Sequence, residues 1–191
     1  MKEIIANSLQ EHLSVADKFV NDPETAAAIE KAARLIAGAI NAGCKVLTCG
    51  NGGSLCDATH FAEELTGRFR NRRGPLPAFC LNDPAHITCV TNDFSFEEIF
   101  ARDVEALGNP GDVLCGFSTS GTSENVLMAA RVARDKGMKV VGFTKAGDTP
   151  LAQLSDVVIA VPHNGYSDRI QEMHITAVHI IIEALEKLVS E

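Results

Sequence analysis

Five short apolar runs, separated by segments with helical periodicity, constrain the fold of this chain more than any other feature. They read KVLTC, PAFCL, DVLCGFS, KVVGFT and VVIAV, at residues 45–49, 77–81, 112–118, 139–144 and 157–161. Their apolar residues are continuous rather than alternating, which is typical of strands buried on both faces of a parallel sheet. The sequence therefore predicts an α/β fold, a three-layer α/β/α sandwich with a five-stranded parallel sheet.

Helical segments flank this predicted core at both ends of the chain. Residues 1–43 show apolar residues at spacings of three and four, with Asp22 as a favourable N-cap and Pro23 at the first position of a second helix. Residues 164–191 predict a long helix that is apolar around much of its circumference, which indicates burial against other subunits as well as the sheet. With residues 44–163 as the α/β core, we expect a single domain.

Charge and hydropathy argue against several classes of function. The formal net charge is −8, and the basic residues are scattered apart from a small group within residues 68–73, so we expect no nucleic-acid partner. The N-terminus resembles no secretory signal, and no run approaches the roughly 18–20 apolar residues of a membrane span. We therefore expect a soluble cytoplasmic protein without a membrane partner. The six cysteines are expected to be reduced thiols, because three lie in strand runs and no CxxC spacing occurs.

Two loops at the expected carboxyl ends of strands suit a phosphorylated ligand. The segment CGNGGS (49–54) lacks the third glycine of a dinucleotide fingerprint and the lysine of a P-loop. Its amides could hold a small anion or a sugar hydroxyl, and a plain turn is an equally good interpretation. The segment STSGTS (118–123) is more informative, because a helix N-cap needs one hydroxyl and this loop has five, which suits the several oxygens of a phosphate.

Two helices carry candidate acid–base or metal-binding side chains. His60 and Glu64 are four residues apart, which places them on one helical face and suits a shared metal, an acid–base pair or an ordinary surface pair. In the last helix Gln171 and His174 are three apart, so spacing alone pairs them. His179 lies about 12 Å from Gln171 along the axis. A histidine within ITAVHIII needs a partner if it is buried, most simply a core hydrogen bond.

Five ordered motifs, CGNGGS, HFAEELTGR, TND, STSGTSENV and DRIQEMHITAVH, resemble the phosphoheptose isomerase family, which has a SIS (sugar isomerase) domain. The resemblance covers essentially the whole chain and implies a flavodoxin-like SIS fold. It also implies an aldose–ketose isomerase that converts D-sedoheptulose 7-phosphate to D-glycero-D-manno-heptose 7-phosphate through an enediolate, for heptose and lipopolysaccharide precursors. A homotetramer with active sites between subunits, and one zinc ion per subunit, are further implications. The alternative on this fold is a non-catalytic tetramer that binds a replication initiator or senses a sugar phosphate.

The same resemblance implies which residues form the site. The implied zinc ligands are His60, Glu64, Gln171 and His179, and the implied acid–base pair is Glu64 and His179. The implied substrate-binding residues are Asn51, Gly52, Gly53, Glu64, Arg68, Asn92, Asp93, Ser118, Thr119, Ser120, Ser123, Asp168 and Gln171. On this assignment His174 is structural, contrary to the spacing argument. Thr122 and Glu124 depart from the pattern of close relatives beside the phosphate loop.

Overall fold

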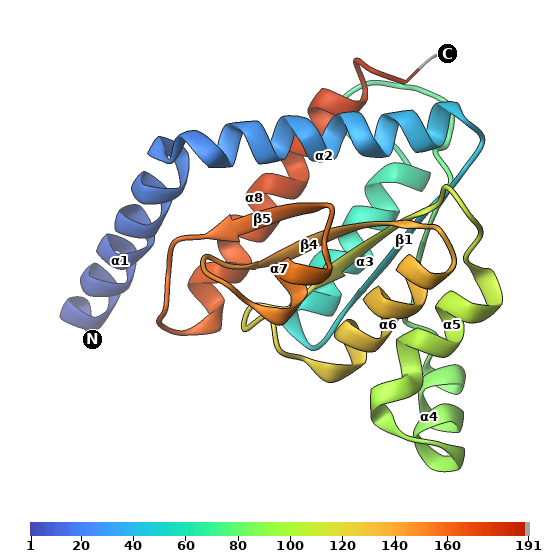
Figure 1. The fold of residues 1–191 in the computed structure, drawn as a ribbon. Coiled ribbons are helices and arrows are strands. Elements are labelled where there is room, and N and C mark those ends of the chain that lie inside the picture. Colours follow the sequence, from blue (N-terminus) through green and yellow to red (C-terminus); the bar gives the residue numbers. More distant parts are fainter. Residues whose placement is uncertain (190–191) are drawn as a thin grey trace.

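A parallel sheet with helices on both faces forms the body of the protein in the computed structural model, which describes residues 1–189 (Figure 1). Its strands are β1 (Val46–Gly50), β2 (Ala78–Cys80), β3 (Val113–Phe117), β4 (Lys139–Lys145) and β5 (Val157–Val161). They pair in the order β2-β1-β3-β4-β5, each pair parallel. The predicted sheet is confirmed, and each strand agrees with its apolar run to within one residue. This order is flavodoxin-like and places the topological switch point between β1 and β3.

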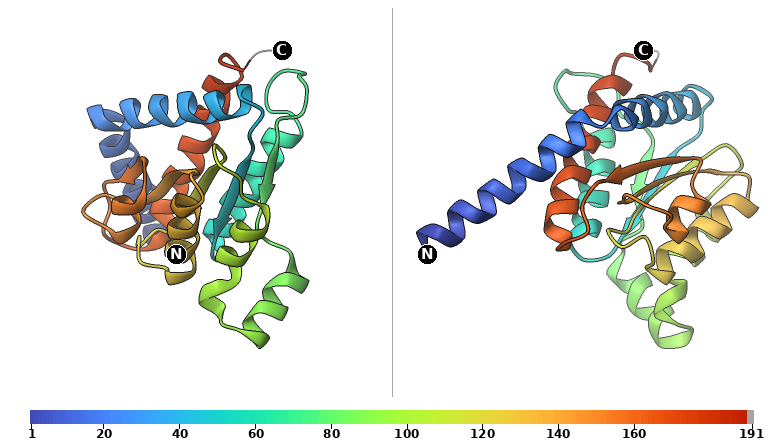
Figure 2. Two further views of the ribbon diagram at one scale, coloured as in Figure 1. Left: turned by 45° about the vertical axis from the view of Figure 1, so that its right-hand side comes forward. Right: turned by 60° about the vertical axis from the view of Figure 1, so that its left-hand side comes forward.

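Eight α-helices and one 3-10 helix lie in the described part of the chain. They are α1 (Lys2–Asn21), α2 (Pro23–Asn41), α3 (Gly53–Thr66), α4 (Pro84–Asp93), η1 (Phe96–Glu98), α5 (Ile99–Leu107), α6 (Glu124–Asp135), α7 (Pro150–Leu154) and α8 (Ser167–Leu185). Helices α2, α3 and α8 cover one face of the sheet, and α5, α6 and α7 cover the other (Figures 1 and 2). The predicted C-terminal segment 164–191 contains α8, and its last two residues lie outside the described part.

Alternate side chains of the central strands β1, β3 and β4 enter two separate apolar clusters. Val46 and Val113 pack under α2, α3 and α8, whereas Leu47 and Leu114 pack under the helices of the opposite face. Burial on both faces explains why the strand runs are continuously apolar in the sequence. None of the described helices has both the length and the apolar character needed to cross a bilayer.

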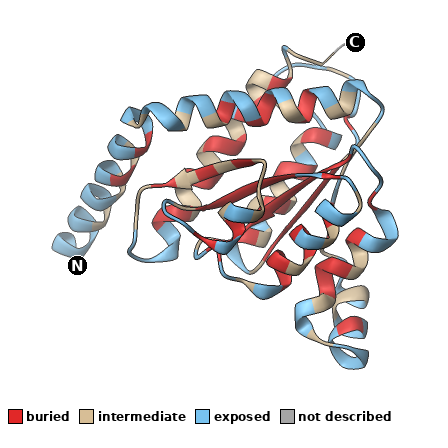
Figure 3. Cartoon of the chain, viewed as in Figure 1, coloured by how far each residue is buried: buried red, intermediate tan, exposed pale blue. Residues whose placement is uncertain are grey.

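The junction of α1 and α2 has the predicted capping geometry. The carboxylate of Asp22 accepts a hydrogen bond from the Glu24 amide at 3.0 Å, and Pro23 occupies the first helical position. Beyond this junction α1 extends away from the sheet (Figure 2). Its outer side is exposed (Figure 3) and includes the apolar side chains of Ile5 and Leu9.

The amino-terminal edge of the sheet is held by a buried carboxylate, Asp112, at the start of β3. It accepts hydrogen bonds from the backbone amides of Lys45 and Asn109 at 2.9 and 2.8 Å, and it pairs with the Lys45 ammonium at 2.5 Å. Burial by itself would raise the pKa of Asp112. The hydrogen bonds from Lys45 and Asn109 outweigh burial, so the pKa lies below its ordinary value of 3.8.

Replacing Asp112 with alanine is expected to destabilise the protein by about 2–4 kcal/mol at pH 7, because two amides and an ammonium lose their acceptor. Folding lowers the pKa of Asp112, so the stabilisation that its ionised carboxylate provides is complete above the unfolded-state pKa. It is lost as pH falls through the folded-state pKa. The melting temperatures of wild type and Asp112→Ala should therefore differ clearly at pH 7, and the difference should shrink below about pH 4. The exposed Asp135→Ala variant is the control. Equal melting temperatures for Asp112→Ala and wild type at pH 7 would contradict this account.

Candidate active site

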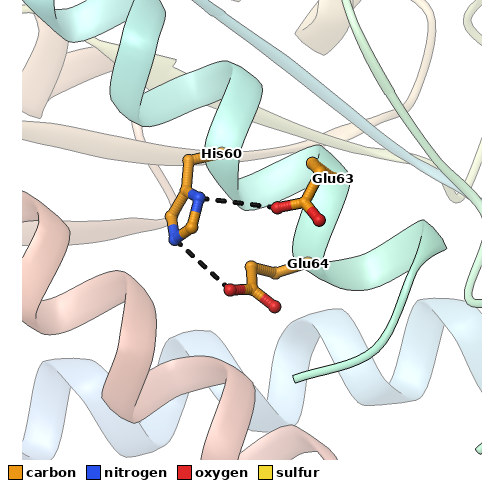
Figure 4. A group of neighbouring side chains, drawn as sticks. All are labelled: His60, Glu63 and Glu64. Carbon is orange, nitrogen blue, oxygen red and sulfur yellow. Dashed lines mark ion pairs between the residues drawn. The ribbon is translucent and has the colours of Figure 1, made fainter.

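His60 on α3 and His179 on α8 face each other where the two helices pack. Their Nε2 atoms are 3.0 Å apart, although the residues are 119 positions apart in the chain. Glu64 Oε1 lies 3.4 Å from His60 Nε2, and Glu63 Oε2 lies 3.5 Å from His60 Nδ1 (Figure 4). The helix–helix contact therefore gathers two imidazoles and two carboxylates at one point.

The donor atoms of this cluster fit a first-row metal ion such as zinc. Zinc bonds of about 2.0–2.2 Å to nitrogen and oxygen place neighbouring tetrahedral ligand atoms roughly 3.3–3.5 Å apart. The separations of 3.0 and 3.4 Å around His60 Nε2 are close to these values. Two facing imidazole nitrogens can also share a proton, but a cation would satisfy both lone pairs at once. The carboxylate of Glu63 lies on the other side of the ring, where outer partners of metal-binding histidines are usually found.

The environment of His179 favours its neutral form. Burial, followed by the nearby His60, lowers the pKa of His179, while Glu64 acts in the opposite direction. The ring of Phe69 stacks on the imidazole with the centroids 5.7 Å apart and an interplanar angle of 25°. A neutral imidazole is the form that binds a metal and that accepts a proton.

Gln171, on α8, lies against the glycine loop that follows β1. A Cβ atom on Gly53 would sit 2.7 Å from Gln171 Oε1, so any side chain at position 53 would displace the Gln171 amide from its present place. The amide of Asn51 pairs with that of Asn125 in both directions, at 2.9 and 2.8 Å. The glycine loop is thus joined to α8 on one side and to the first turn of α6 on the other.

His174 belongs to the core and not to this site. It is fully buried, its Nε2 lies 3.2 Å from the carbonyl oxygen of Thr144, and burial lowers its pKa to about 4. The interpretation from spacing, which pairs Gln171 with His174, is wrong. Each helical residue turns the chain by about 100°, so His174 points about 60° to one side of Gln171 and His179 about 80° to the other. The first direction leads to the sheet and the second to α3.

The hydroxyl loop, residues 118–123, closes on itself at the N-terminus of α6. Ser118 Oγ lies 2.9 Å from Ser123 Oγ and 3.4 Å from Ser120 Oγ. Gly121 has a φ of +70°, and a Cβ there would be 2.5 Å from the Thr149 side chain. Ser123 makes no side-chain cap, and these hydroxyls gather at the positive, N-terminal end of α6.

The two residues that depart from the family pattern have local partners. Thr122 Oγ1 lies 2.9 Å from Ser120 Oγ, so it extends the chain of hydroxyls. Glu124 pairs with Arg131 along α6 at 2.6 Å. Its charge is therefore partly neutralised where it would otherwise repel an anion.

Four predicted substrate positions lie at the surface of the single chain. Asn92 and Asp93 end α4 and hydrogen-bond to each other at 2.7 Å, and Asp168 lies 3.7 Å from Arg169. Arg68 is exposed just after α3. Within the described residues, no hydrogen bond or ion pair joins these four side chains to the histidine cluster. The fold of one chain therefore assembles the His60 cluster, the glycine loop and the hydroxyl loop, and leaves Arg68, Asn92, Asp93 and Asp168 apart.

A family model, that of the SIS domain, matches residues 12–145, which include the glycine loop, His60, Glu64 and the hydroxyl loop. The chain belongs to the SIS domain family. The phosphoheptose isomerase of Sodalis glossinidius is 52% identical to this chain over 186 residues, covering 97% of this chain and 96% of that protein. The phosphoheptose isomerase of Vibrio cholerae is also 52% identical, covering 97% of each chain.

A comparison with solved structures agrees. The phosphoheptose isomerase of Neisseria gonorrhoeae superposes with a TM-score of 0.90 at 34% identity, over 97% of this chain and 98% of that one.

One further carboxyl of the SIS domain, Asp57, lies beside the cluster one turn before His60. Its Oδ2 is buried without a hydrogen-bond partner among the described residues. Burial raises the pKa of Asp57 to about 6, with His60 acting in the opposite direction. In the sequence Asp57 stands three residues before His60, a spacing that places two side chains on one helical face. Perturbed carboxyls of this kind are concentrated at functional sites.

Proposed function

We propose that this SIS-domain protein is a phosphoheptose isomerase that converts D-sedoheptulose 7-phosphate into D-glycero-D-manno-heptose 7-phosphate. The observation that carries the proposal is the His60–Glu64–His179 cluster, in a chain 52% identical to phosphoheptose isomerases along nearly its whole length. The product belongs to heptose synthesis, and we assign it to lipopolysaccharide precursors. Since sugar phosphates are intracellular metabolites, we assign the reaction to the cytoplasm.

An aldose–ketose isomerisation needs one group for carbon-bound protons and one for oxygen-bound protons. Glu64 removes the proton from the carbon beside the carbonyl and returns it to the neighbouring carbon. His179, neutral because burial and His60 lower its pKa, moves the proton between the two oxygens. His60, Glu64, Gln171 and His179 would hold a zinc ion, and a bound zinc ion would supply positive charge for the developing oxyanion.

The remaining residues hold the substrate in place. The phosphate is assigned to Ser118, Thr119, Ser120 and Ser123, in the loop that leads into the N-terminus of α6. Asn51, Gly52 and Gly53 contact the sugar at the end of β1, together with Glu64 and Gln171 on α3 and α8. Binding at the distant phosphate positions the reacting carbons, so part of that binding energy lowers the barrier.

A homotetramer accounts for two features of the single chain. The first is the row of apolar side chains on α1, in which Leu9 and Leu13 are 62% and 58% exposed. The second is an apolar groove between α2 and α8, lined by Ile29, Ile180 and Ala184 among others. Packing of these surfaces between copies would bury both. A site built between subunits would also bring Arg68, Asn92, Asp93 and Asp168 to the substrate.

Incubation of the purified protein with sedoheptulose 7-phosphate, followed by NMR, tests the proposed function. We expect signals of the heptose 7-phosphate aldose to grow, and dephosphorylated sedoheptulose to be turned over far more slowly because it lacks the anchoring phosphate. A light-scattering measurement on the same sample gives the oligomeric state. No conversion by the folded protein under any metal condition would refute the isomerase.

That negative result would favour a sugar-phosphate sensor or a tetramer that binds a replication initiator, the second candidate on this fold. The presence of both Glu64 and His179 speaks against it, because the resemblance implies that the initiator-binding relatives lack these two residues.

A further inference from the structure

One face of α8 is lined by the segment that joins α3 to β2, residues 67–77, here called the α3–β2 segment. His179, Glu183 and Glu186 follow one another on this face at spacings of four and three. Each has a partner in the α3–β2 segment: Phe69 stacks on His179, Arg70 pairs with Glu183, and Arg73 pairs with Glu186. The segment therefore follows α8 from the histidine cluster to the end of the helix.

Arg73 also binds the end of α3. Its Nη2 donates to the carbonyl oxygen of Glu64 at 2.7 Å, its Nη1 donates to that of Leu65 at 2.8 Å, and its Nε donates to Glu186 Oε1 at 3.0 Å. The last carbonyl groups of a helix have no partner within the helix, and a cation at this end also meets the negative end of the dipole. The Arg73 and Glu186 side chains are only 13% and 7% exposed. One guanidinium thus joins the C-terminal ends of α3 and α8.

We propose that Arg73 is a positioning residue for the histidine cluster. It holds the backbone of Glu64 directly, and through Glu186 it holds the helix that carries His179. Glu186 lies seven residues after His179, or about 10.5 Å along the axis and almost directly in line with it. Fixing both helix ends therefore sets the distance between Glu64 and His179. Only the catalytic consequence of this inference rests on the proposed function.

A planar guanidinium suits this role and an ammonium does not. Arg73 donates to two successive carbonyls and a carboxylate from a rigid fork, whereas lysine offers one compact charge at the end of a flexible chain. The neighbouring Arg72 is exposed on the same segment. Arg73→Lys and Arg72→Lys therefore make the same chemical change, one at the helix ends and one in solvent.

The test compares these two variants by steady-state kinetics and by titration of the metal-free proteins with Co²⁺, followed by visible absorption. For Arg73→Lys we expect kcat to fall about 10- to 100-fold, with KM within about threefold, because a shift of about 1 Å at a catalytic group can cost 10²-fold. The Kd for Co²⁺ should rise about 10- to 100-fold, the usual effect of losing an outer support of a metal site. Arg72→Lys should match wild type in both measurements.

Wild-type kcat and Co²⁺ affinity in Arg73→Lys would overturn the proposal, and so would a change confined to KM. If wild type does not isomerise the substrate, the proposed function fails, but the Co²⁺ titration still tests Arg73. If wild type binds no Co²⁺, the imidazole NMR signals of His60 and His179 decide. Shifts in Arg73→Lys but not in Arg72→Lys support the role, and unchanged signals refute it.

A second variant keeps the test decisive if circular dichroism shows that Arg73→Lys does not fold. Glu186→Gln preserves the hydrogen bonds from Arg73 to α3 and weakens only the link to α8. We expect changes in kcat and Co²⁺ affinity in the same direction, about three- to tenfold, since a neutral acceptor replaces a charged one. Folded Glu186→Gln with unchanged kcat, Co²⁺ affinity and histidine signals would refute the link between the helices.

Discussion

Replacing Glu64 with glutamine is expected to lower kcat about 10²- to 10⁴-fold, the range that follows the loss of one well-placed acid–base group. The amide has nearly the same size as the carboxylate, but it cannot accept a proton from carbon. The Glu64 side chain is 16% exposed and lies 3.4 Å from His60, so a substitution of equal size should leave the packing of α3 unchanged. We therefore expect a melting temperature close to that of wild type.

Two further measurements separate proton transfer from a general loss of structure. Solvent deuterium should enter the carbon-bound positions of the sugar with wild-type enzyme, and should enter at a correspondingly lower rate with Glu64→Gln. The control is Glu105→Gln, because Glu105 is exposed on α5, a helix on the opposite face of the sheet from the histidine cluster. That control should retain activity within about tenfold. If Glu64→Gln also stayed within tenfold of wild type, another group would have to move the carbon-bound proton.

The sheet could be predicted from sequence because both of its faces are buried, which requires a continuous apolar run in the sequence at each strand. Every strand from β1 to β5 coincides with a continuous apolar run. The helices between residues 84 and 107 gave weaker signals, because α4 and α5 are only 10 and 9 residues long. The capping of α2 by Asp22 was also predictable, since it depends only on neighbours in the sequence.

The site was less accessible to sequence reasoning because it depends on how α3 and α8 pack. Spacing places His174 closer to Gln171 than His179, yet the face that meets α3 carries His179. The resemblance to a family indicated His179 as the site residue, whereas helical periodicity favoured His174. The hydrogen bonds of Arg73 could not be predicted from the sequence either, since Glu64 and Glu186 are brought together only by the crossing of two helices. The burial of Asp57 and the contact between Glu63 and His60 likewise depend on surroundings that the sequence does not show.

Removal of bound metal by a chelator should lower kcat about 10²- to 10³-fold, because several kcal/mol of oxyanion stabilisation by a cation would be lost. Zinc should restore the activity, and magnesium should not, because it prefers an octahedral shell of oxygen ligands to a site with two imidazoles. The chelated protein should keep its oligomeric state and most of its thermal stability, since α3 and α8 are also joined by Arg73 and Glu186.

His179→Gln provides the matching variant, because it removes one of the two facing imidazoles while His174 continues to fill the core. Its activity should not return with zinc. Zinc affinity of the wild type should also fall as the pH drops toward the pKa of His179, which burial and His60 lower from its ordinary value, since a ligating imidazole must be neutral and protons then compete with the metal. Full turnover by rigorously metal-free wild type would remove zinc from the reaction. Glu64 and His179 would then act as an acid–base pair without a metal. The contact between the Nε2 atoms of His60 and His179 would be an ordinary shared hydrogen bond.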